Sequence, residues 1–399
     1  MESNSVICIA GKNEIAVYGL SLALSKVKKE NIKVLCNSTD NGIDTWQPSL
    51  LKAAQKKNIS VISIEDCYQI RDLIFLSLEY DKIISPKKFK KASLFNIHFS
   101  KLPSYKGMYT SSLPLLHGEM ESGVSLHEID SGIDTGDIID QINFKIDKVD
   151  TARHLYSKYL FHSKKLLKKN FSNLLNRTIQ SIPQSSLDSS YYSSKTIDYK
   201  NLEIDLLATA EQIKNQIRAF TFPEYQVPTI YGYHVNRALI QKVKSKKKPG
   251  NLLSVSEKEL VISTVDYDLK LLRDKNSDLF DAAISDDISK AKKSINFGAD
   301  PNTQNGNGWT PLIVACFNGS LNVARLLIKK GADVNKQNFK GTTPLMYAMS
   351  FYEKNKDRLL FDLLVKNGAK IENHDMHSKT ILDYAKERKI LNLFKPNKH

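Results

Sequence analysis

Two short sequence patterns repeat in the last third of the chain, and they restrict its fold more than any other feature. One reads Gly-Ala-Asp-x-Asn and the other Gly-x-Thr-Pro-Leu, and each returns after 33 residues. Weaker copies follow after a further 37 residues. The copies occupy residues 298–302, 331–335 and 368–372 for the first pattern, and residues 308–312, 341–345 and 378–382 for the second. Because a repeat of this length buries its apolar side only against its neighbours, residues 276–399 are predicted to form a stack of repeats.

The residue types within each repeat fit a pair of helices. Thr310 can cap a helix that begins at Pro311, where the missing N–H of proline has no helical partner to lose. The glycine of the Gly-Ala-Asp pattern suits the left-handed backbone position that follows a helix. Four extra residues before the third copy fall in the polar stretch 352–358, which predicts one lengthened loop. The whole pattern resembles ankyrin repeats, and this resemblance implies an all-α stack.

Before residue 180, short apolar segments alternate with amphipathic ones. Strands are predicted at residues 6–10, 33–36, 60–62 and 73–77, with a further strand from residue 92 leading into Asn96, and helices at 15–29, 48–57 and 151–176. Alternation of this kind predicts an α/β domain with an open, mostly parallel sheet, over residues 1–180. In such a sheet the active groups lie at the carboxyl ends of the strands.

A serine-rich stretch at residues 181–194, which contains Pro183, is predicted to be a linker. A small mixed α+β middle domain is predicted over residues 191–273. It contains a helix at residues 206–220 and short strands around a lysine-rich turn.

Composition sets broad limits on function. The formal charge of +15 suits nucleic acid, an anionic surface or a phosphate-bearing small substrate, and does not choose among them. The four cysteines are scattered, which predicts reduced thiols with no disulfide framework and no metal site. No apolar run approaches the length of about 18 residues that a membrane span needs. The run at residues 6–10 is too short for a signal peptide, so we expect a cytoplasmic protein.

Two polar residues near the end of one predicted strand are candidates for catalysis. In an extended strand Asn96 and His98 point to one face, while Ile97 points to the other. Pro103 and the glycine at position 107 then turn the chain into a loop, which leaves room for a cleft. An amide donor and an imidazole that project from the same strand end suit acyl transfer to an amine.

The sequence around these residues resembles the signature of the formyltransferases that use 10-formyltetrahydrofolate. Residues 96–98 read Asn-Ile-His, residues 100–107 read Ser-Lys-Leu-Pro-Ser-Tyr-Lys-Gly, and residues 134–136 read Asp-Thr-Gly. The resemblance implies that Asp134 lies beside His98 and orients its imidazole. It also implies that Asn96 stabilises the oxyanion, whereas His98 either takes the amine proton or donates to the oxyanion. Folate is the implied co-substrate, and no metal is required.

Further likeness concerns the formyl acceptor. Residues 40–47 and 218–225 resemble segments of dTDP-amino-sugar N-formyltransferases, which implies a nucleotide-linked amino sugar, with dTDP-3-amino-3,6-dideoxyglucose as the expected acceptor for surface polysaccharide. Lys106, Tyr109, Phe222 and Tyr225 are predicted to contact sugar, diphosphate or base. Their alternatives are a surface charge for the lysine and interdomain packing for the aromatic residues.

Two other functions compete with this prediction. A methionyl-tRNA formyltransferase is favoured by the positive charge, although the middle domain is short for a tRNA-binding appendage. A noncatalytic ankyrin scaffold is the other, and the intact Asn96, His98 and Asp134 argue against it. Family members of this type often form homodimers through the middle domain, which we also expect here.

The ankyrin stack predicts a second site of interaction. Trp309 occupies a variable position of the repeat, whose side chains line the concave groove, near Asn305, Asn318 and Tyr347 in repeat coordinates. An exposed indole can stack on a pyrimidine base, so these residues are predicted to form a second, noncatalytic nucleotide-sugar site. The alternative is an ordinary protein-binding module.

Overall fold

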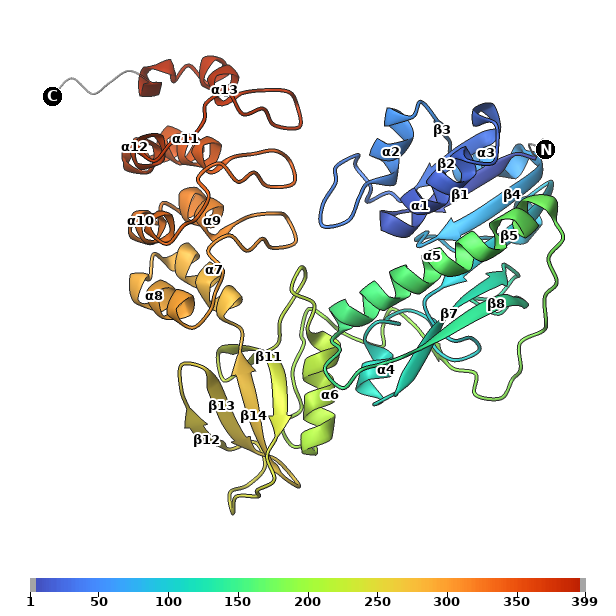
Figure 1. The fold of residues 1–399 in the computed structure, drawn as a ribbon, viewed down its shortest axis with the longest axis horizontal. Helices are drawn as coiled ribbons and strands as arrows, with labels where there is room; N and C mark the ends of the chain where they lie inside the picture. Colours follow the sequence, from blue (N-terminus) through green and yellow to red (C-terminus); the bar gives the residue numbers. More distant parts are fainter. Residues whose placement is uncertain (1–4, 395–399) are drawn as a thin grey trace. The chain divides into compact units, whose positions relative to one another are not determined.

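The structure, a computed structural model, describes residues 5–394 (Figure 1). The chain forms two compact units. The first extends to Glu203 and takes in Asn215–Thr221, whereas the second consists of Ile204–Lys214 and the chain from Phe222 onward. Within the described residues, no helix has both the length and the apolar character that crossing a bilayer requires.

The first unit is built on a seven-stranded sheet with the order β3-β2-β1-β4-β5-β7-β8. Its strands are β1 (Ile7–Gly11), β2 (Ile32–Cys36), β3 (Ser60–Val61), β4 (Arg71–Leu78), β5 (Lys91–His98), β7 (Glu121–Glu128) and β8 (Ile138–Lys145). The five strands from β3 to β5 pair in parallel, whereas β7 pairs antiparallel with both β5 and β8. The predicted open, mostly parallel sheet is therefore confirmed, with an antiparallel edge added.

Helices cover this sheet, which explains why its central strands are apolar along their length. All of β1 is buried, as are residues 73–78 of β4. The helices of the unit are α1 (Asn13–Leu24), α2 (Leu50–Lys56), α3 (Ile64–Gln69), α4 (Leu113–Leu116) and α5 (Ala152–Asn176), with 3-10 turns at Lys29–Asn31 and Pro86–Lys88. The long α5 packs on β7 and β8 through apolar residues at helical spacing, including Leu155, Tyr159 and Leu166.

Residues 181–194, predicted to be a linker, instead belong to the first unit. Within this segment β9 (Tyr191–Tyr192) pairs in parallel with β6 (Lys106–Gly107) of the loop that follows β5. Ile182 forms a further bridge with Ile138 at the start of β8. We call residues 181–194 the strap.

The second unit contains a five-stranded antiparallel sheet of the order β10-β11-β14-β13-β12. The strands are β10 (Thr229–Ile230), β11 (Tyr233–Ile240), β12 (Leu252–Val255), β13 (Glu259–Ser263) and β14 (Asp268–Arg273). The preceding helix α6 (Ala210–Phe220) starts later than the predicted residue 206. The reason is a cap at Thr209, whose hydroxyl accepts from Gln212 N–H at 3.3 Å while its own N–H donates to Gln212 Oε1 at 3.0 Å.

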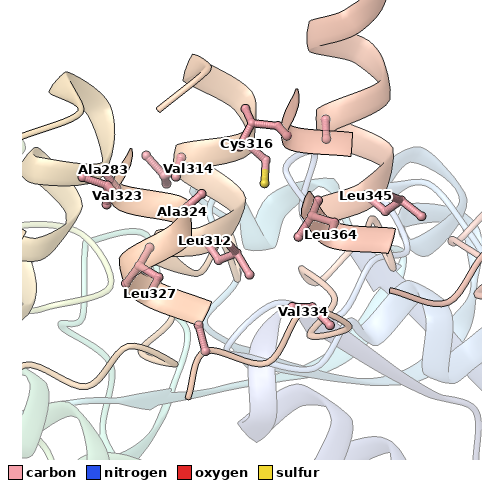
Figure 2. Packing of buried hydrophobic residues seen from close by; sticks show 14 of the residues in the cluster. Ala283, Leu312, Val314, Cys316, Val323, Ala324, Leu327, Val334, Leu345 and Leu364 are labelled. Atoms are coloured by element: carbon pink, nitrogen blue, oxygen red, sulfur yellow. The ribbon is translucent and has the colours of Figure 1, made fainter. Parts of the chain in front are cut away.

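The repeats form successive helix pairs, as predicted. They are α7 (Lys275–Ser285) with α8 (Ile288–Asn296), α9 (Pro311–Asn318) with α10 (Leu321–Lys329), and α11 (Pro344–Asn355) with α12 (Leu359–Lys366), followed by α13 (Ile381–Glu387) and a 3-10 turn at Leu391–Phe394. Thr310 caps α9 by accepting from Ile313 N–H, with Pro311 at the first helical position. Apolar side chains such as Leu312, Leu345 and Leu364 fill the space between repeats (Figure 2).

The asparagine of the Gly-Ala-Asp-x-Asn pattern links one repeat to the next. Asn302 Nδ2 donates to Gly331 O at 2.9 Å, while its Oδ1 accepts from Asp333 N–H at 2.8 Å. Asn335 forms the same two bonds with Gly368 and Lys370. The asparagine recurs in the sequence because it makes the same contact with the backbone of the next repeat each time.

One prediction about the repeats is wrong. The four extra residues before the third copy do not lengthen a loop but extend a helix, because α11 has 12 residues where α9 has 8. Lys356, in the left-handed conformation, ends α11.

Candidate active site

The site forms where strands of the first unit end. Asn96 and His98 lie on β5, and the antiparallel neighbour β7 places His127 opposite Asn96. Asp134 follows on the loop between β7 and β8, with a left-handed backbone (φ 56°). The topology thus brings together polar residues that lie far apart in the sequence.

The Asp134 carboxylate is the centre of this group. One oxygen, Oδ1, accepts from Asn96 Nδ2 at 3.2 Å. The other, Oδ2, lies 3.4 Å from His98 Nδ1 and accepts from Gly107 N–H at 2.9 Å. The structure therefore brings Asn96, His98 and Asp134 together, in the arrangement that the family resemblance implied.

Gly107 is needed as glycine for this contact. Its φ of 85° disfavours other residues, and a Cβ here would lie 2.2 Å from Tyr192 O of the strap. The loop can therefore approach the strap closely and point its N–H at Asp134.

His127 is a member of the site that sequence analysis missed. The ring is buried, and Nδ1 lies 2.7 Å from Glu128 O, so Nδ1 carries the proton. Nε2 lies 3.1 Å from Asn96 Nδ2 and 3.5 Å from Asp134 Oδ1. Asn96 therefore directs its amide nitrogen at both His127 and Asp134, which fixes the orientation of its side chain.

Both ring nitrogens of His98 have oxygen partners. Nε2 lies 2.8 Å from Tyr105 O, and Nδ1 faces the Asp134 carboxylate. A carbonyl and a carboxylate both accept hydrogen bonds, so each ring nitrogen of His98 faces an acceptor oxygen that holds the ring in place.

The electrostatics agree with an ionised Asp134. Burial acts to raise the pKa of this carboxyl group, but the charge of His98 and hydrogen bonds from His127 and Gly107 outweigh burial and hold the pKa well below its usual range. The site thus holds a permanent negative charge beside the imidazole.

These residues line a cleft of about 640 Å³ in the first unit. Three apolar residues on its walls are unusually exposed: Ile83 (78%), Met108 (47%) and Ile133 (37%). Large exposed apolar side chains beside a polar cluster are typical of a binding site for a ligand with both characters.

Glu79, at the end of β4, is a second residue of the cleft that sequence analysis missed. Burial raises the pKa of its carboxyl group to about 7, although hydrogen bonds from Tyr156 and Asn13 and the charge of Lys12 act against this. The Tyr156 hydroxyl donates to Glu79 Oε2 at 3.0 Å. Glu79 can therefore exchange a proton near neutral pH, next to the catalytic strand.

The predicted substrate-binding residues lie elsewhere. Lys106 is buried with Nζ 3.0 Å from Ser189 Oγ, and the Tyr109 hydroxyl donates to Ser194 O at 2.7 Å, so both face the strap. Neither lines the cleft, although Gly107 does. Phe222 and Tyr225 belong to the second unit, where their rings pack 4.9 Å apart. Contact of these four with substrate remains a prediction.

Only some of the four residues of the predicted ankyrin site contact one another. The ring of Trp309 lies 4.8 Å from that of Tyr347 and 5.2 Å from that of Phe317, so the indole is half-buried in an aromatic cluster. Asn305 Oδ1 accepts from Trp309 N–H at 3.1 Å and thus shapes the preceding turn. Asn318 is exposed at the end of α9, with Nδ2 bonded to Val314 O.

Comparisons with known proteins agree with this geometry. A formyl transferase family model matches residues 23–170, the C-terminal domain model of formyl transferases matches residues 196–278, and a model of three ankyrin repeats matches residues 279–375. A solved N-formyltransferase from Helicobacter canadensis is 42% identical with a TM-score of 0.63, and the match covers 68% of this chain and 100% of that one. The chain belongs to the formyltransferase family.

Two further proteins are similar to this formyltransferase. The sugar 3N-formyl transferase WlaRD is 43% identical with a TM-score of 0.63, and the match covers 67% of this chain and 97% of WlaRD. The bifunctional polymyxin resistance protein ArnA of Wigglesworthia glossinidia brevipalpis is 30% identical over 284 residues, which are 67% of this chain but 42% of ArnA. The predictions of an N-formyltransferase enzyme and of ankyrin repeats are confirmed.

Proposed function

We propose that this enzyme transfers the formyl group of 10-formyltetrahydrofolate to the amine of a dTDP-linked amino-dideoxysugar. The proposed acceptor is dTDP-3-amino-3,6-dideoxyglucose, used in the cytoplasm for surface polysaccharide. The observation that carries the proposal is the meeting of Asn96, His98 and Asp134 in one cleft.

Similar proteins support the choice of donor and acceptor. The H. canadensis enzyme was solved with folinic acid and dTDP-3-aminofucose, and WlaRD was solved with dTDP and 5-N-formyl-THF. The cleft of this chain suits such ligands, because the exposed Ile83, Met108 and Ile133 can cover an apolar ring system beside the polar strand ends.

Each residue of the site has a separate role in the proposed formyl transfer. When the neutral amine attacks the formyl carbon, negative charge grows on the formyl oxygen. The Asn96 amide and the His98 ring stabilise it when an N–H turns from its present acceptor, Asp134 for Asn96 or Tyr105 O for His98, toward that oxygen. Asp134 holds the His98 ring in place. As the new C–N bond forms and the bond to the folate nitrogen breaks, the proton lost by the amine reaches that nitrogen through His98.

A product assay tests this proposal. The purified chain is incubated with 10-formyltetrahydrofolate and a panel of dTDP- and UDP-linked amino sugars, and products are followed by mass spectrometry. We expect dTDP-3-amino-3,6-dideoxyglucose to gain the mass of one CO, and the His98→Ala variant to form almost no product. Formylation of initiator methionyl-tRNA, with every sugar unchanged, would overturn the acceptor assignment.

We propose further that the ankyrin stack holds a second, noncatalytic nucleotide-sugar site around Trp309. Its support is the aromatic cluster of Trp309, Phe317 and Tyr347, in which Phe317 exposes 48% of its surface and offers a stacking face for a base. Calorimetry on the full-length His98→Ala variant should show two binding events with the nucleotide sugar. Adding Trp309→Ala should leave one, and a single event in both proteins would refute the second site.

We also propose that the chain forms a homodimer through the sheet of the middle domain. Strands β11 and β12 leave Ile240, Leu252 and Val255 exposed, which a second copy can cover. Sedimentation should give twice the mass of the chain, with Ile240→Glu shifting it toward the monomer. A monomer at micromolar concentration would contradict this assembly.

A further inference from the structure

We propose that Gln184 is a positioning residue for formyl transfer, which acts by holding the turn that carries Asp134. The inference rests on the proposed role of Asp134 beside His98. Gln184 belongs to the strap, a segment whose serine-rich sequence predicts only a linker.

Gln184 makes two contacts with this turn. Its Nε2 donates to Asp134 O at 2.8 Å and to Gly136 O at 2.8 Å. Because both partners are carbonyl oxygens, only the amide nitrogen can face them. Within residues 5–394, Gln184 Oε1 is buried without a hydrogen-bond partner, so the amide is oriented by the turn alone.

The turn needs such a restraint. Asp134 is left-handed, with a φ of 56°, a conformation that aspartate tolerates better than most non-glycine residues but that is held more firmly when neighbouring groups bond to the turn. On the other side the turn is pressed against the end of β7, where a Cβ on Gly136 would lie 2.0 Å from Glu128 O. Gln184 bonds both ends of the turn from residue 134 to residue 136. Rotation of the backbone at Asp134 would therefore break these bonds and move the carboxylate away from His98.

The strap also holds the other partner of His98. Tyr105, whose carbonyl faces His98 Nε2, donates its N–H to Ser190 Oγ at 2.8 Å. The next residue of the loop, Lys106, donates its N–H to Ser190 O at 2.9 Å. The strap thus restrains the imidazole on both sides, through Gln184 and Asp134 on one and through Ser190 and Tyr105 on the other.

The test compares Gln184→Met, which keeps the shape of the side chain without its donors, with the matched control Gln180→Met at an exposed position of the preceding segment. We expect kcat of Gln184→Met to fall by about 10- to 100-fold, because small misplacements of catalytic groups have effects of this size. KM for both substrates should stay within about twofold, since the walls of the cleft remain. Gln180→Met should behave as the wild type.

A double-mutant cycle separates positioning from a general effect on folding. In the Asp134→Asn background, Gln184→Met should lower the remaining activity by less than about twofold, because the carboxylate through which it acts is gone. An equal loss in both backgrounds, or a kcat of Gln184→Met equal to that of the wild type, would overturn the inference. If Asp134→Asn were itself fully active, the proposed function of the site would fail instead.

Discussion

Replacement of Glu79 by glutamine should change how the stability of the first unit depends on pH. Burial raises the pKa of Glu79 from its usual 4.5 to about 7 in the folded protein. Between these values the folded protein binds more protons than the unfolded chain, so the free energy of unfolding falls as pH rises from about 4.5 to about 7. The fall attributable to Glu79 is at most about 3 to 4 kcal/mol, because each unit by which the folded and unfolded pKa differ is worth about 1.36 kcal/mol.

Tryptophan fluorescence can follow this unit alone. The chain has two tryptophans, Trp46 in the first unit and Trp309 in the second, so Trp309→Phe leaves a single reporter. Urea unfolding of this variant, with and without Glu79→Gln, is measured from pH 4.5 to pH 8. Other titrating groups are common to both proteins and cancel in the difference.

The glutamine variant should gain stability relative to its parent as pH rises through this window, with the gain levelling off above about pH 7. Glutamine keeps the size of the side chain and an oxygen that can accept from Tyr156, which limits structural effects. Parallel pH dependences in the two proteins would refute a buried carboxyl group with a raised pKa.

Three other substitutions test separate parts of the structure. Asn96→Ala should lower kcat by about 10²- to 10³-fold in a formyl-transfer assay, as loss of an oxyanion donor does elsewhere, and an unchanged kcat would exclude that role. Gly107→Ala should lower the melting temperature and the activity together, because its Cβ would meet Tyr192 O at 2.2 Å, and an unaltered melting curve would contradict this contact. Asn302→Ala should destabilise the repeats by about 1–3 kcal/mol through two lost hydrogen bonds, seen in the Trp309 fluorescence of a Trp46→Phe background, while turnover stays normal. A matching loss of turnover would show that the repeats act on catalysis.

The repeats were the most predictable part of the fold, because each recurring residue of the pattern has an identifiable structural role. Thr310 caps a helix, Pro311 begins it, and Asn302 bonds to the neighbouring repeat. The extension of α11 was not predictable in the same way, since the polar residues near 352–358 suit either a loop or an exposed helical turn.

At the candidate site, only some of the residues could be predicted from local sequence patterns. Alternation along a strand predicts that Asn96 and His98 share a face, but it says nothing about which strand lies beside them. His127 enters through the antiparallel register of β7, and Gln184 through a segment without apolar periodicity. Glu79 could have been found from one sequence feature, because it is a charged residue directly after a long apolar strand. Contacts that depend on strand register or on irregular segments could therefore not be predicted, because no short-range sequence pattern encodes them.

The most direct test of the account is the single-turnover rate of formyl transfer from 10-formyltetrahydrofolate to dTDP-3-amino-3,6-dideoxyglucose, measured for the wild type and for Asp134→Asn. The carboxylate that pairs with His98 is lost in this variant, while the shape of the site is kept. We expect rapid turnover by the wild type and a loss of about 10³- to 10⁴-fold in the variant, by analogy with the effect of removing such a carboxylate from a catalytic triad. Equal rates for the two proteins, or no transfer to the sugar by the wild type, would contradict it.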